Sequence, residues 1–384
     1  MTIVLESAWT LESEPVELAQ AVGRVLARDV TSDLDMPPFD KAAMDGYACR
    51  RADLGHELSV VETIPAGHAP GQRIDADLCA RIMTGGMVPD GADCVVMVEQ
   101  TEQPTPDTVR FIGRQTSDNI CPRGEDVRAG QVVLRQGTRI RPQHIAIAAA
   151  VGCSRPRVAR RPEVAVLSTG DELVPPGDRP QVSQIRDSNS GQLCAQVQQV
   201  GAMARNYGIV ADRPEEIETT LRRAIVDNDV VLLSGGVSAG DYDYVPQVMA
   251  QIGLEVLFHQ IAITPGKPTV FGVSDKACCF GLPGNPVSSF VVFELLVKPF
   301  LYKMMGHEYR PLCVPVPLAA PLRRGKTDRQ SWIPVVITAA SRVEPVEYHG
   351  AAHIAALRDA DGLIRMDVGV GQIDQGVPVT VRLI

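Results

Sequence analysis

Three loops rich in glycine or proline carry the residues with the clearest chemical potential, and each follows an apolar run. The loops read Ser168-Thr-Gly-Asp-Glu172, Ser234-Gly-Gly-Val-Ser-Ala-Gly-Asp-Tyr-Asp243 and Leu282-Pro-Gly-Asn-Pro286. Glycines let backbone N–H groups approach an anion, and a following helix N-terminus favours negative charge. Two of the loops also carry carboxylates, which would repel a phosphate unless a cation lay between them. The pattern predicts a phosphorylated ligand held together with a divalent metal.

Carboxylates in turn-like segments are the candidate metal ligands, although aspartate is also a common turn residue. Glu172, Asp212 and Asp243 are favoured because loops at the carboxyl ends of parallel strands lie together at one edge of a sheet. Mg²⁺ takes one or two carboxylates together with phosphate oxygens and water. We therefore predict Mg²⁺ at these residues.

Lys267 is the candidate cation for the phosphate. In Thr264-Pro-Gly-Lys-Pro268 it is either a solvated turn lysine or a point charge on a phosphate. The prolines on both sides restrict the loop, and this favours the second interpretation.

The elements that must position these loops alternate between strand and helix from Val164 onward. Helical stretches at 190–200 and 213–226 separate the apolar runs, and this predicts a doubly wound α/β sheet with mainly parallel strands. Asn285 is expected to cap a helix over 287–297, with Pro286 at its first position.

The regions on either side of this segment show a different pattern of secondary structure. A short amphipathic helix is expected over 14–23, and short β-branched runs between 57 and 135 predict a small all-β domain. A packed helix is expected over 144–152. After about residue 307 the short strands return, and a small terminal β-barrel or β-sandwich fits them.

Composition limits the class of protein. The chain has 384 residues, 45% of them hydrophobic, and a net charge of −9, so several domains are expected and nucleic acid is an improbable main partner. No apolar stretch is long enough to span a membrane, and the start lacks signal-peptide features. Nine cysteines without a C-x-x-C pair predict reduced thiols in a cytoplasm, with Cys278 and Cys279 in the core.

Taken together, the motifs resemble the molybdopterin molybdenumtransferase family, which includes the E domain of gephyrin. The resembling segments follow the family order and cover essentially the whole chain. They are Pro37-Pro-Phe-Asp-Lys-Ala-Ala-Met-Asp-Gly-Tyr-Ala48, Arg81-Ile-Met-Thr-Gly-Gly86, Gly124-Glu-Asp126, Ser168-Thr-Gly-Asp-Glu-Leu173, Gln184-Ile-Arg-Asp-Ser-Asn189, Ser234-Gly-Gly-Val-Ser-Ala-Gly-Asp-Tyr-Asp-Tyr244, Pro265-Gly-Lys-Pro268 and Leu282-Pro-Gly-Asn-Pro-Val-Ser288.

The resemblance implies an elongated homodimer of four-domain chains. The implied domains are a linker and dimerisation domain (1–30 and 128–161), a β-rich domain (31–127), an α/β molybdopterin-binding domain (162–306) and a C-terminal β-barrel domain (307–384). The site would lie between one subunit's α/β domain and the partner's β-rich domain.

The resemblance also implies a reaction and its residues. Adenylylated molybdopterin and molybdate would be the substrates, with Mg²⁺ assisting and AMP released. The implied catalytic residues are Asp45, Thr84, Asp126, Glu172, Asp212 and Asp243, of which the last three hold the metal or position the leaving phosphate. Ser234, Gly235 and Gly236 would cradle the pterin phosphate, while Pro283 and Pro286 shape the wall. The full set of expected substrate-binding residues is Ser168, Thr169, Gly170, Ser234, Gly235, Gly236, Ser238, Gly240, Lys267, Pro283, Gly284, Asn285 and Pro286. A molybdopterin adenylyltransferase and molybdoenzyme apoproteins are the implied partners.

Two alternatives stay open at this point. One is a related enzyme that uses another oxyanion, such as tungstate, and the other is a non-catalytic pterin-binding or scaffold protein of the same fold. Family members often carry other residues at Lys41-Ala42, Gln260, Thr264, Ser331 and Ala351. The retained carboxylates favour an enzyme, because a scaffold has no need for like charges in one cleft.

Overall fold

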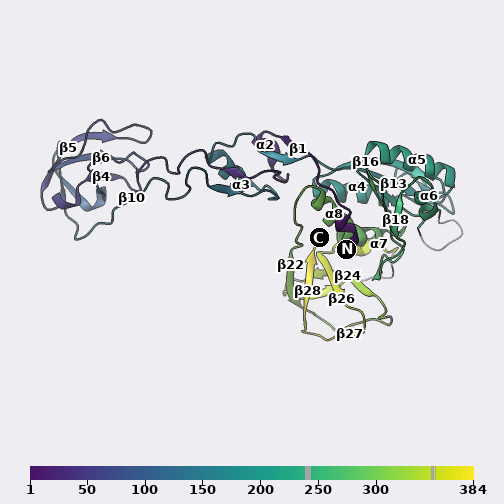
Figure 1. Cartoon of the computed structure of the whole chain (residues 1–384). Coiled ribbons are helices and arrows are strands. Elements are labelled where there is room, and N and C mark those ends of the chain that lie inside the picture. Colours follow the sequence, from purple (N-terminus) through teal and green to yellow (C-terminus); the bar gives the residue numbers. More distant parts are fainter. Residues whose placement is uncertain (238–243, 347–349, 351) are drawn as a thin grey trace.

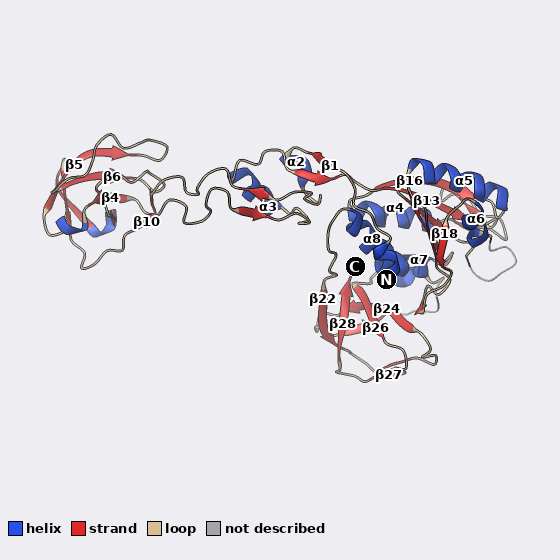
Figure 2. Cartoon of the chain, viewed as in Figure 1, coloured by secondary structure: helices blue, strands red, loops and turns tan. Residues whose placement is uncertain are grey.

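The chain is elongated, with a β-rich region at one end and an α/β region packed beside a second β region at the other (Figure 1). The computed structural model of the chain describes residues 1–237, 244–346, 350 and 352–384. A narrow segment of paired short strands and two helices connects the two ends (Figure 2). Among the described residues, no helix has the length and apolar character needed to cross a bilayer.

The β-rich region is a six-stranded sheet, which confirms the expected small β domain. Only β5 and β6 run parallel; the other pairs are antiparallel. In sheet order the strands are β7 (Cys94–Met97), β4 (Gly46–Cys49), β6 (Leu78–Ile82), β5 (Glu57–Ile64), β9 (Thr108–Phe111) and β8 (Thr101–Thr105), and beside them lie η1 (Arg51–Asp53), η2 (Val98–Gln100) and the pair β3 (Lys41–Ala42) and β10 (Ile120–Cys121).

The connecting segment contains two short antiparallel pairs, and here one sequence prediction is wrong. The pairs are β1 (Ser13–Pro15) with β12 (Arg157–Ala159) and β2 (Val30–Thr31) with β11 (Val132–Leu134). Residues 14–23 do not form one helix, because the β1–β12 pairing takes residues 13–15 and leaves only α2 (Leu18–Ala21) helical. This pairing joins segments over 140 positions apart, and such tertiary contacts override weak local helix propensity. Helix α3 (Pro142–Ala150) forms as expected.

The α/β region is built on a sheet whose strand order places the three loops of interest side by side. Strands β13 (Glu163–Thr169), β17 (Val230–Ser234) and β21 (Cys278–Leu282) are parallel and adjacent. The whole order is β16 (Met203–Val210), β13, β17, β21, β20 (Val270–Val273) and β18 (Glu255–Phe258), with β20 and β18 antiparallel to their neighbours. The prediction that these loops meet at the carboxyl ends of parallel strands is confirmed.

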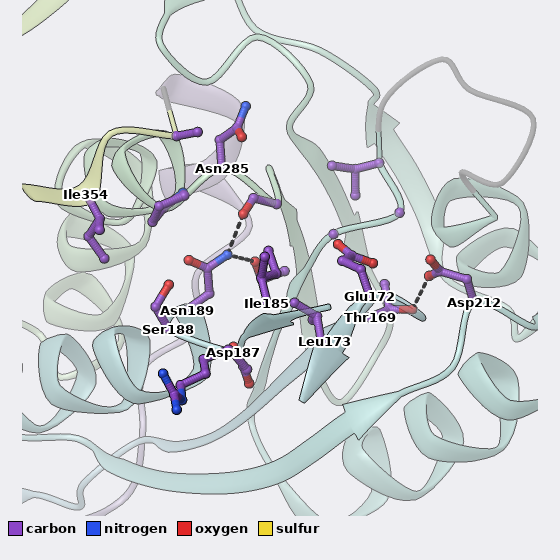
Figure 3. A pocket seen from close by; sticks show the side chains of 18 residues that line it. Thr169, Glu172, Leu173, Ile185, Asp187, Ser188, Asn189, Asp212, Asn285 and Ile354 are labelled. Carbon is purple, nitrogen blue, oxygen red and sulfur yellow. Dashed lines mark hydrogen bonds between the residues drawn. The ribbon is translucent and has the colours of Figure 1, made fainter. Parts of the chain in front are cut away.

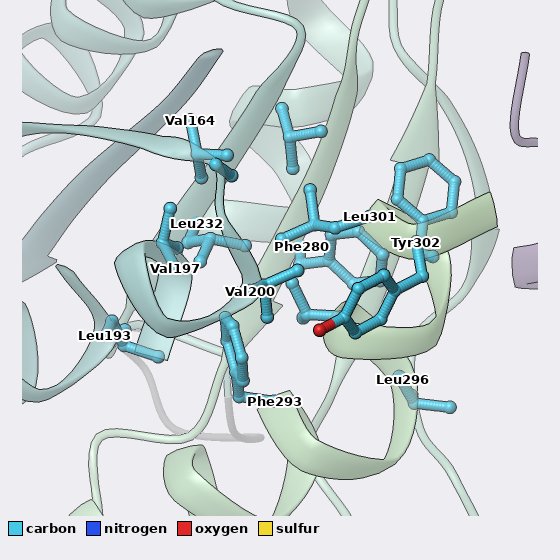
Figure 4. Close-up of a cluster of buried hydrophobic side chains, with 14 of the residues drawn as sticks. Val164, Leu193, Val197, Val200, Leu232, Phe280, Phe293, Leu296, Leu301 and Tyr302 are labelled. Carbon is cyan, nitrogen blue, oxygen red and sulfur yellow. The ribbon is translucent and has the colours of Figure 1, made fainter. Parts of the chain in front are cut away.

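Alternation along the central strands creates a core on each face of this sheet. Val164 and Val166 enter one core, whereas Ala165 and Leu167 enter the other. The first core is covered by α4 (Asn189–Val200), α7 (Pro286–Val292), the π-helical turn η3 (Phe293–Val297) and α8 (Lys298–Met304), and the second by α5 (Pro214–Asp227) and α6 (Val245–Gln251). Figure 4 shows the first of these cores. Helices on both faces confirm the doubly wound arrangement.

Two smaller predictions about this region can be compared directly with the structure. Cys278 and Cys279 are fully buried, which confirms that they belong to the core. Asn285 is the N-cap residue and Pro286 is the first helical residue, as expected, although the Asn285 side chain makes no capping hydrogen bond. Helix α1 (Thr2–Glu6) adds Val4 to the same core.

The C-terminal region forms a third six-stranded sheet, and one of its strands comes from the α/β region. That strand is β19 (Ile263–Thr264), which pairs in parallel with β24 (Gln330–Ile337). The order continues through β26 (Gly362–Met366), β28 (Pro378–Leu383) and β22 (Cys313–Pro317); β25 (Val343–Pro345) pairs with β24, and β23 (Leu322–Arg323) pairs with β27 (Gln372–Ile373). The shared sheet joins the C-terminal region to the α/β region.

Candidate functional site

A polar cavity of about 490 Å³ lies where β13, β17 and β21 end (Figure 3). Its lining includes Thr169, Glu172, Asp212, Ser234, Gly235, Gly236, Gly284, Asn285 and Pro286, all of which the sequence singled out. Leu173, Ile185, Arg186, Asp187, Ser188, Asn189 and Val237 complete its α/β part. Ala352 and Ile354 come from the C-terminal region, where Ile354 begins the short helix η4 (Ile354–Leu357).

The residues just before and at the start of helix α4 fasten the first loop. The carboxylate of Asp187 accepts hydrogen bonds from the Ser168 hydroxyl (3.0 Å) and from the backbone N–H of Ser190 (3.1 Å). The hydroxyls of Ser168 and Ser190 are 2.9 Å apart. Because all three side chains are buried, Ser168 supports the cavity from beneath rather than lining it.

Asn189 fastens the second and third loops. Its Nδ2 donates to the Ser234 hydroxyl oxygen and to the Gly284 carbonyl, each at 2.7 Å (Figure 3). The Ser234 hydroxyl in turn donates to the Pro283 carbonyl at 3.3 Å. Ser234 lines the cavity as expected, whereas Pro283, which was expected to shape its wall, is not among the lining residues.

The loop backbones supply donors for an anion. In the part of the chain that the structure describes, the N–H groups of Gly236, Val237, Gly284 and Asn285 donate no hydrogen bond to another residue. All four residues line the cavity. Unpaired N–H groups grouped at strand ends form a concave site of positive potential, which suits a phosphate.

Gly235 is required by the close approach of two of these loops. Its φ is +101°, and a Cβ there would lie 2.4 Å from the carbonyl oxygen of Thr169. No side chain fits at that distance without displacing one strand end from the other.

Gly235→Ala should lower the free energy of unfolding by about 1–3 kcal/mol, because the added methyl group forces the backbones of the first two loops apart. Gly191→Ala is the matched control: Gly191 is an exposed residue of helix α4 with no atom near the added carbon, so alanine should raise stability by about 0.5–1 kcal/mol. Denaturant titration of both variants measures the difference. Equal effects would show that the loops are not packed as described.

Two carboxylates face the cavity from one side (Figure 3). Asp212 accepts a short hydrogen bond from the Thr169 hydroxyl, and its own backbone N–H donates to the Asp171 carboxylate at 3.2 Å. A Cβ on Gly170 would lie 2.5 Å from the Glu172 carboxylate oxygen, so glycine permits that carboxylate to fold back over the loop. Two carboxylates beside an anion cradle form a donor set that fits Mg²⁺.

Some of the expected residues lie elsewhere. Lys267 is exposed and is not among the residues lining the cavity, while its carbonyl accepts the N–H groups of Ile261 and Thr269. Ser238, Gly240, Asp243 and Ala351 fall outside the described residues. Thr264 and Ser331 are neighbours across the β19–β24 pair, and the Arg324 guanidinium donates to the Ser331 hydroxyl at 2.5 Å.

A second group of expected residues lies at the far end of the chain, in the β-rich region (Figure 1). Asp45 precedes β4 and Thr84 follows the neighbouring strand β6, so the sheet brings them together. The Asp45 carboxylate accepts both the hydroxyl and the backbone N–H of Thr84 at 2.6 Å. Asp126 is exposed near the connecting segment, where its N–H donates to the Met36 carbonyl.

The hydroxyl of Thr84, followed by its backbone N–H, holds the pKa of Asp45 below its ordinary value. Thr84→Val should therefore raise the pKa of Asp45 towards that value, since the larger contribution is lost. The folded-state pKa lies below the unfolded pKa of about 3.9, so the ionised carboxyl stabilises the folded protein above that unfolded pKa. This stabilisation is lost as the pH falls through the folded-state pKa. NMR titration of the Asp45 carboxyl carbon measures the shift; an unchanged pKa would contradict the hydrogen-bond assignment.

Among the described residues, one trio of possible metal ligands converges, and it lies away from the cavity. It consists of Asp53, His56 and Asp77. His56 Nδ1 and Asp77 Oδ1 are 2.6 Å apart, and Arg50 lies 3.5 Å from Asp53. The side chains therefore neutralise one another, and nothing further suggests an ion there.

The fold and the cavity define a class: a multidomain α/β protein with a cavity suited to an anion at its strand ends. The chain belongs to the molybdopterin molybdenumtransferase (MoeA) family. Residues 1–152 match the MoeA N-terminal region (domains I and II), residues 165–303 a probable molybdopterin-binding domain, and residues 315–384 the MoeA C-terminal region (domain IV).

Individual relatives agree with this assignment. The molybdopterin molybdenumtransferase of Staphylococcus epidermidis is 34% identical over 382 residues, covering 96% of this chain and 90% of the relative. That of Bacillus subtilis is 31% identical over 387 residues, covering 97% and 90%. A solved structure of the molybdopterin biosynthesis MoeA protein from Pyrococcus horikoshii OT3 superposes with a TM-score of 0.87 at 29% identity, covering 100% of this chain and 98% of the other.

Proposed function

We propose that this chain inserts molybdenum into molybdopterin, using adenylylated molybdopterin and molybdate as substrates and releasing AMP. The observation that carries the proposal is the cavity, in which unpaired backbone N–H groups and two carboxylates lie together. This combination suits a phosphate ester that reacts beside a cation. The relatives described above are named molybdopterin molybdenumtransferases.

In this proposal each part of the cavity has one task. The N–H groups of the second and third loops hold the pterin phosphate, and Glu172 and Asp212 hold Mg²⁺. When bound, that cation would offset the negative charge that develops on the phosphoanhydride as AMP leaves. Thr169 keeps Asp212 in place through its hydroxyl. We propose the same metal role for Asp243.

The Asp45–Thr84 pair requires a second subunit in this proposal. Within one chain the pair and the cavity lie at opposite ends of an elongated molecule (Figure 1). A homodimer with 31–127 of one copy facing 162–306 of the other brings an ionised carboxylate to the substrate. The domain division given from the sequence is retained as part of the proposal, as is a cytoplasmic location, where an adenylylating enzyme supplies the substrate.

The test combines purified protein with adenylylated molybdopterin, Mg²⁺ and molybdate. We expect release of AMP and, in equal amount, molybdenum bound to the pterin. A parallel reaction with tungstate identifies the preferred oxyanion. Binding of the substrate without AMP release under either oxyanion would indicate a pterin-binding scaffold and would overturn the proposal.

A further inference from the structure

Asn189 occupies an unusual place in the cavity. It is only 8% exposed, yet it lines the cavity and contacts two different loops. The Gly284 carbonyl can only accept a hydrogen bond, so the amide nitrogen must face it and the orientation of the amide is determined. It follows that Ser234 receives its hydrogen bond from Asn189 and directs its own proton to Pro283.

The contacts of Asn189 complete a set that begins with its neighbours. Asp187 and Ser190 hold Ser168 at the end of β13, while Asn189 holds Ser234 at the end of β17 and Gly284 after β21. Three residues at or just before the start of one helix thus join all three loops. The second and third loops touch directly, since a Cβ on Gly284 would lie 3.6 Å from the Gly235 Cα.

The anion cradle is built from two loops, and Asn189 contacts both of them from a third segment of the chain. Gly236 and Val237 follow Ser234, whereas Asn285 follows Gly284, so the unpaired N–H groups belong to two separate loops. The Asn189 side-chain amide donates one hydrogen bond to each loop, to Ser234 and to Gly284, both at 2.7 Å. N–H groups that converge on one anion bind it well only if their relative positions are held before binding.

We propose that Asn189 is a positioning residue: its amide holds the second and third loops in the register that lets their N–H groups bind one phosphate. This inference rests on the proposed function, because it assigns the cradle to the pterin phosphate. Asn189 itself acts through the loop backbones rather than on the reacting atoms.

The chain contains a close match for a control. Asn228 is 6% exposed, and its Nδ2 also donates two hydrogen bonds, to the Tyr207 hydroxyl and the Ala224 carbonyl, each at 2.9 Å. Among the described residues, the Oδ1 atoms of both asparagines are buried without a partner. Asn228 does not line the cavity. The two sites therefore lose equivalent interactions on substitution and differ in what they join.

The first experiment measures binding of molybdopterin by equilibrium fluorescence titration to the wild type, Asn189→Ala and Asn228→Ala. We expect Asn189→Ala to raise the Kd at least roughly tenfold, equivalent to about 1.4 kcal/mol, and Asn228→Ala to change it less than about twofold. Asn189→Asp, which keeps the shape but loses both donor bonds, should weaken binding at least as much. Equal Kd values for Asn189→Ala and Asn228→Ala would overturn the inference.

A second readout needs no ligand. The Gly235 N–H donates to the Leu282 carbonyl at 3.0 Å across the two loops, so it reports their register. Hydrogen exchange followed by mass spectrometry should show faster exchange at 234–237 in Asn189→Ala and unchanged exchange there in Asn228→Ala. If the wild type fails to bind molybdopterin, the proposed function fails, and the exchange result still decides whether Asn189 holds the loops.

Discussion

Asp212→Asn should lower the rate of AMP release by roughly two to three orders of magnitude, the usual cost of removing one preorganised electrostatic group from a transition state. Asparagine keeps the shape of the side chain and can still bond the Thr169 hydroxyl, so the loop should retain its conformation. What is lost is the negative charge that, in the proposed function, would hold the cation beside the phosphoanhydride. Steady-state measurement of AMP release with saturating Mg²⁺ checks the effect.

Asp178→Asn is the matched control for this substitution. Asp178 is an exposed aspartate in the loop between β14 (Leu173–Val174) and β15 (Ile185–Arg186), and Arg186 bonds its carbonyl rather than its carboxylate. It should retain wild-type turnover. Comparable turnover for Asp212→Asn and the wild type would show that Asp212 takes no part in the reaction.

Glu294→Ala should lower the free energy of unfolding by about 3–5 kcal/mol, because it leaves a buried cation without its partner. The Glu294 carboxylate bonds Lys298 Nζ at 2.7 Å and Gln196 Nε2 at 3.1 Å, and its carbonyl accepts a short hydrogen bond from Arg382 of β28. The ion pair is almost fully buried, with side chains 11% and 2% exposed. This network lies in the π-helical turn where the α/β region meets the C-terminal sheet.

An exposed ion pair of the same spacing provides the control. Glu218 and Arg222 on α5 are also four residues apart and 2.8 Å from each other, but both are substantially exposed, so Glu218→Ala should cost less than about 0.5 kcal/mol. Trp9 and Trp332, the two tryptophans, both pack against the first core, which also contains Phe293 and Leu295, so tryptophan fluorescence follows the relevant unfolding transition. Similar losses in the two variants would contradict the assigned burial of the pair.

The sequence predicts the cavity well where local pattern and sheet geometry coincide. Apolar runs that end in glycine-rich loops identify β13, β17 and β21, and parallel pairing then requires their ends to meet. Thr169, Glu172, Asp212, Gly235 and Asn285 follow from that rule, and the structure places all five around one cavity. These residues lie close together because the strands that precede them pair in parallel, and the apolar runs in the sequence already indicate those strands.

Other features depend on contacts that no local pattern reveals. Asn189 belongs to a quoted motif, but its role appears only when the carbonyl of Gly284 lies 2.7 Å away. Ile354 reaches the cavity because the C-terminal sheet shares a strand with the α/β region. Lys267 shows the opposite case: the proline-bounded loop suggested a fixed charge at the cavity, yet it presents Lys267 to solvent.

The most direct test of the central claim, that each site combines the cavity of one subunit with the Asp45–Thr84 pair of another, is subunit complementation. Asp45→Asn and Asp212→Asn chains, each inactive alone, are mixed under conditions that exchange subunits, and AMP release is measured. Random mixing should restore about one quarter of wild-type activity, since half of the dimers are mixed and each mixed dimer holds one intact site. No recovery, although mixed dimers are present, would show that both groups act within one chain or that Asp45 takes no part.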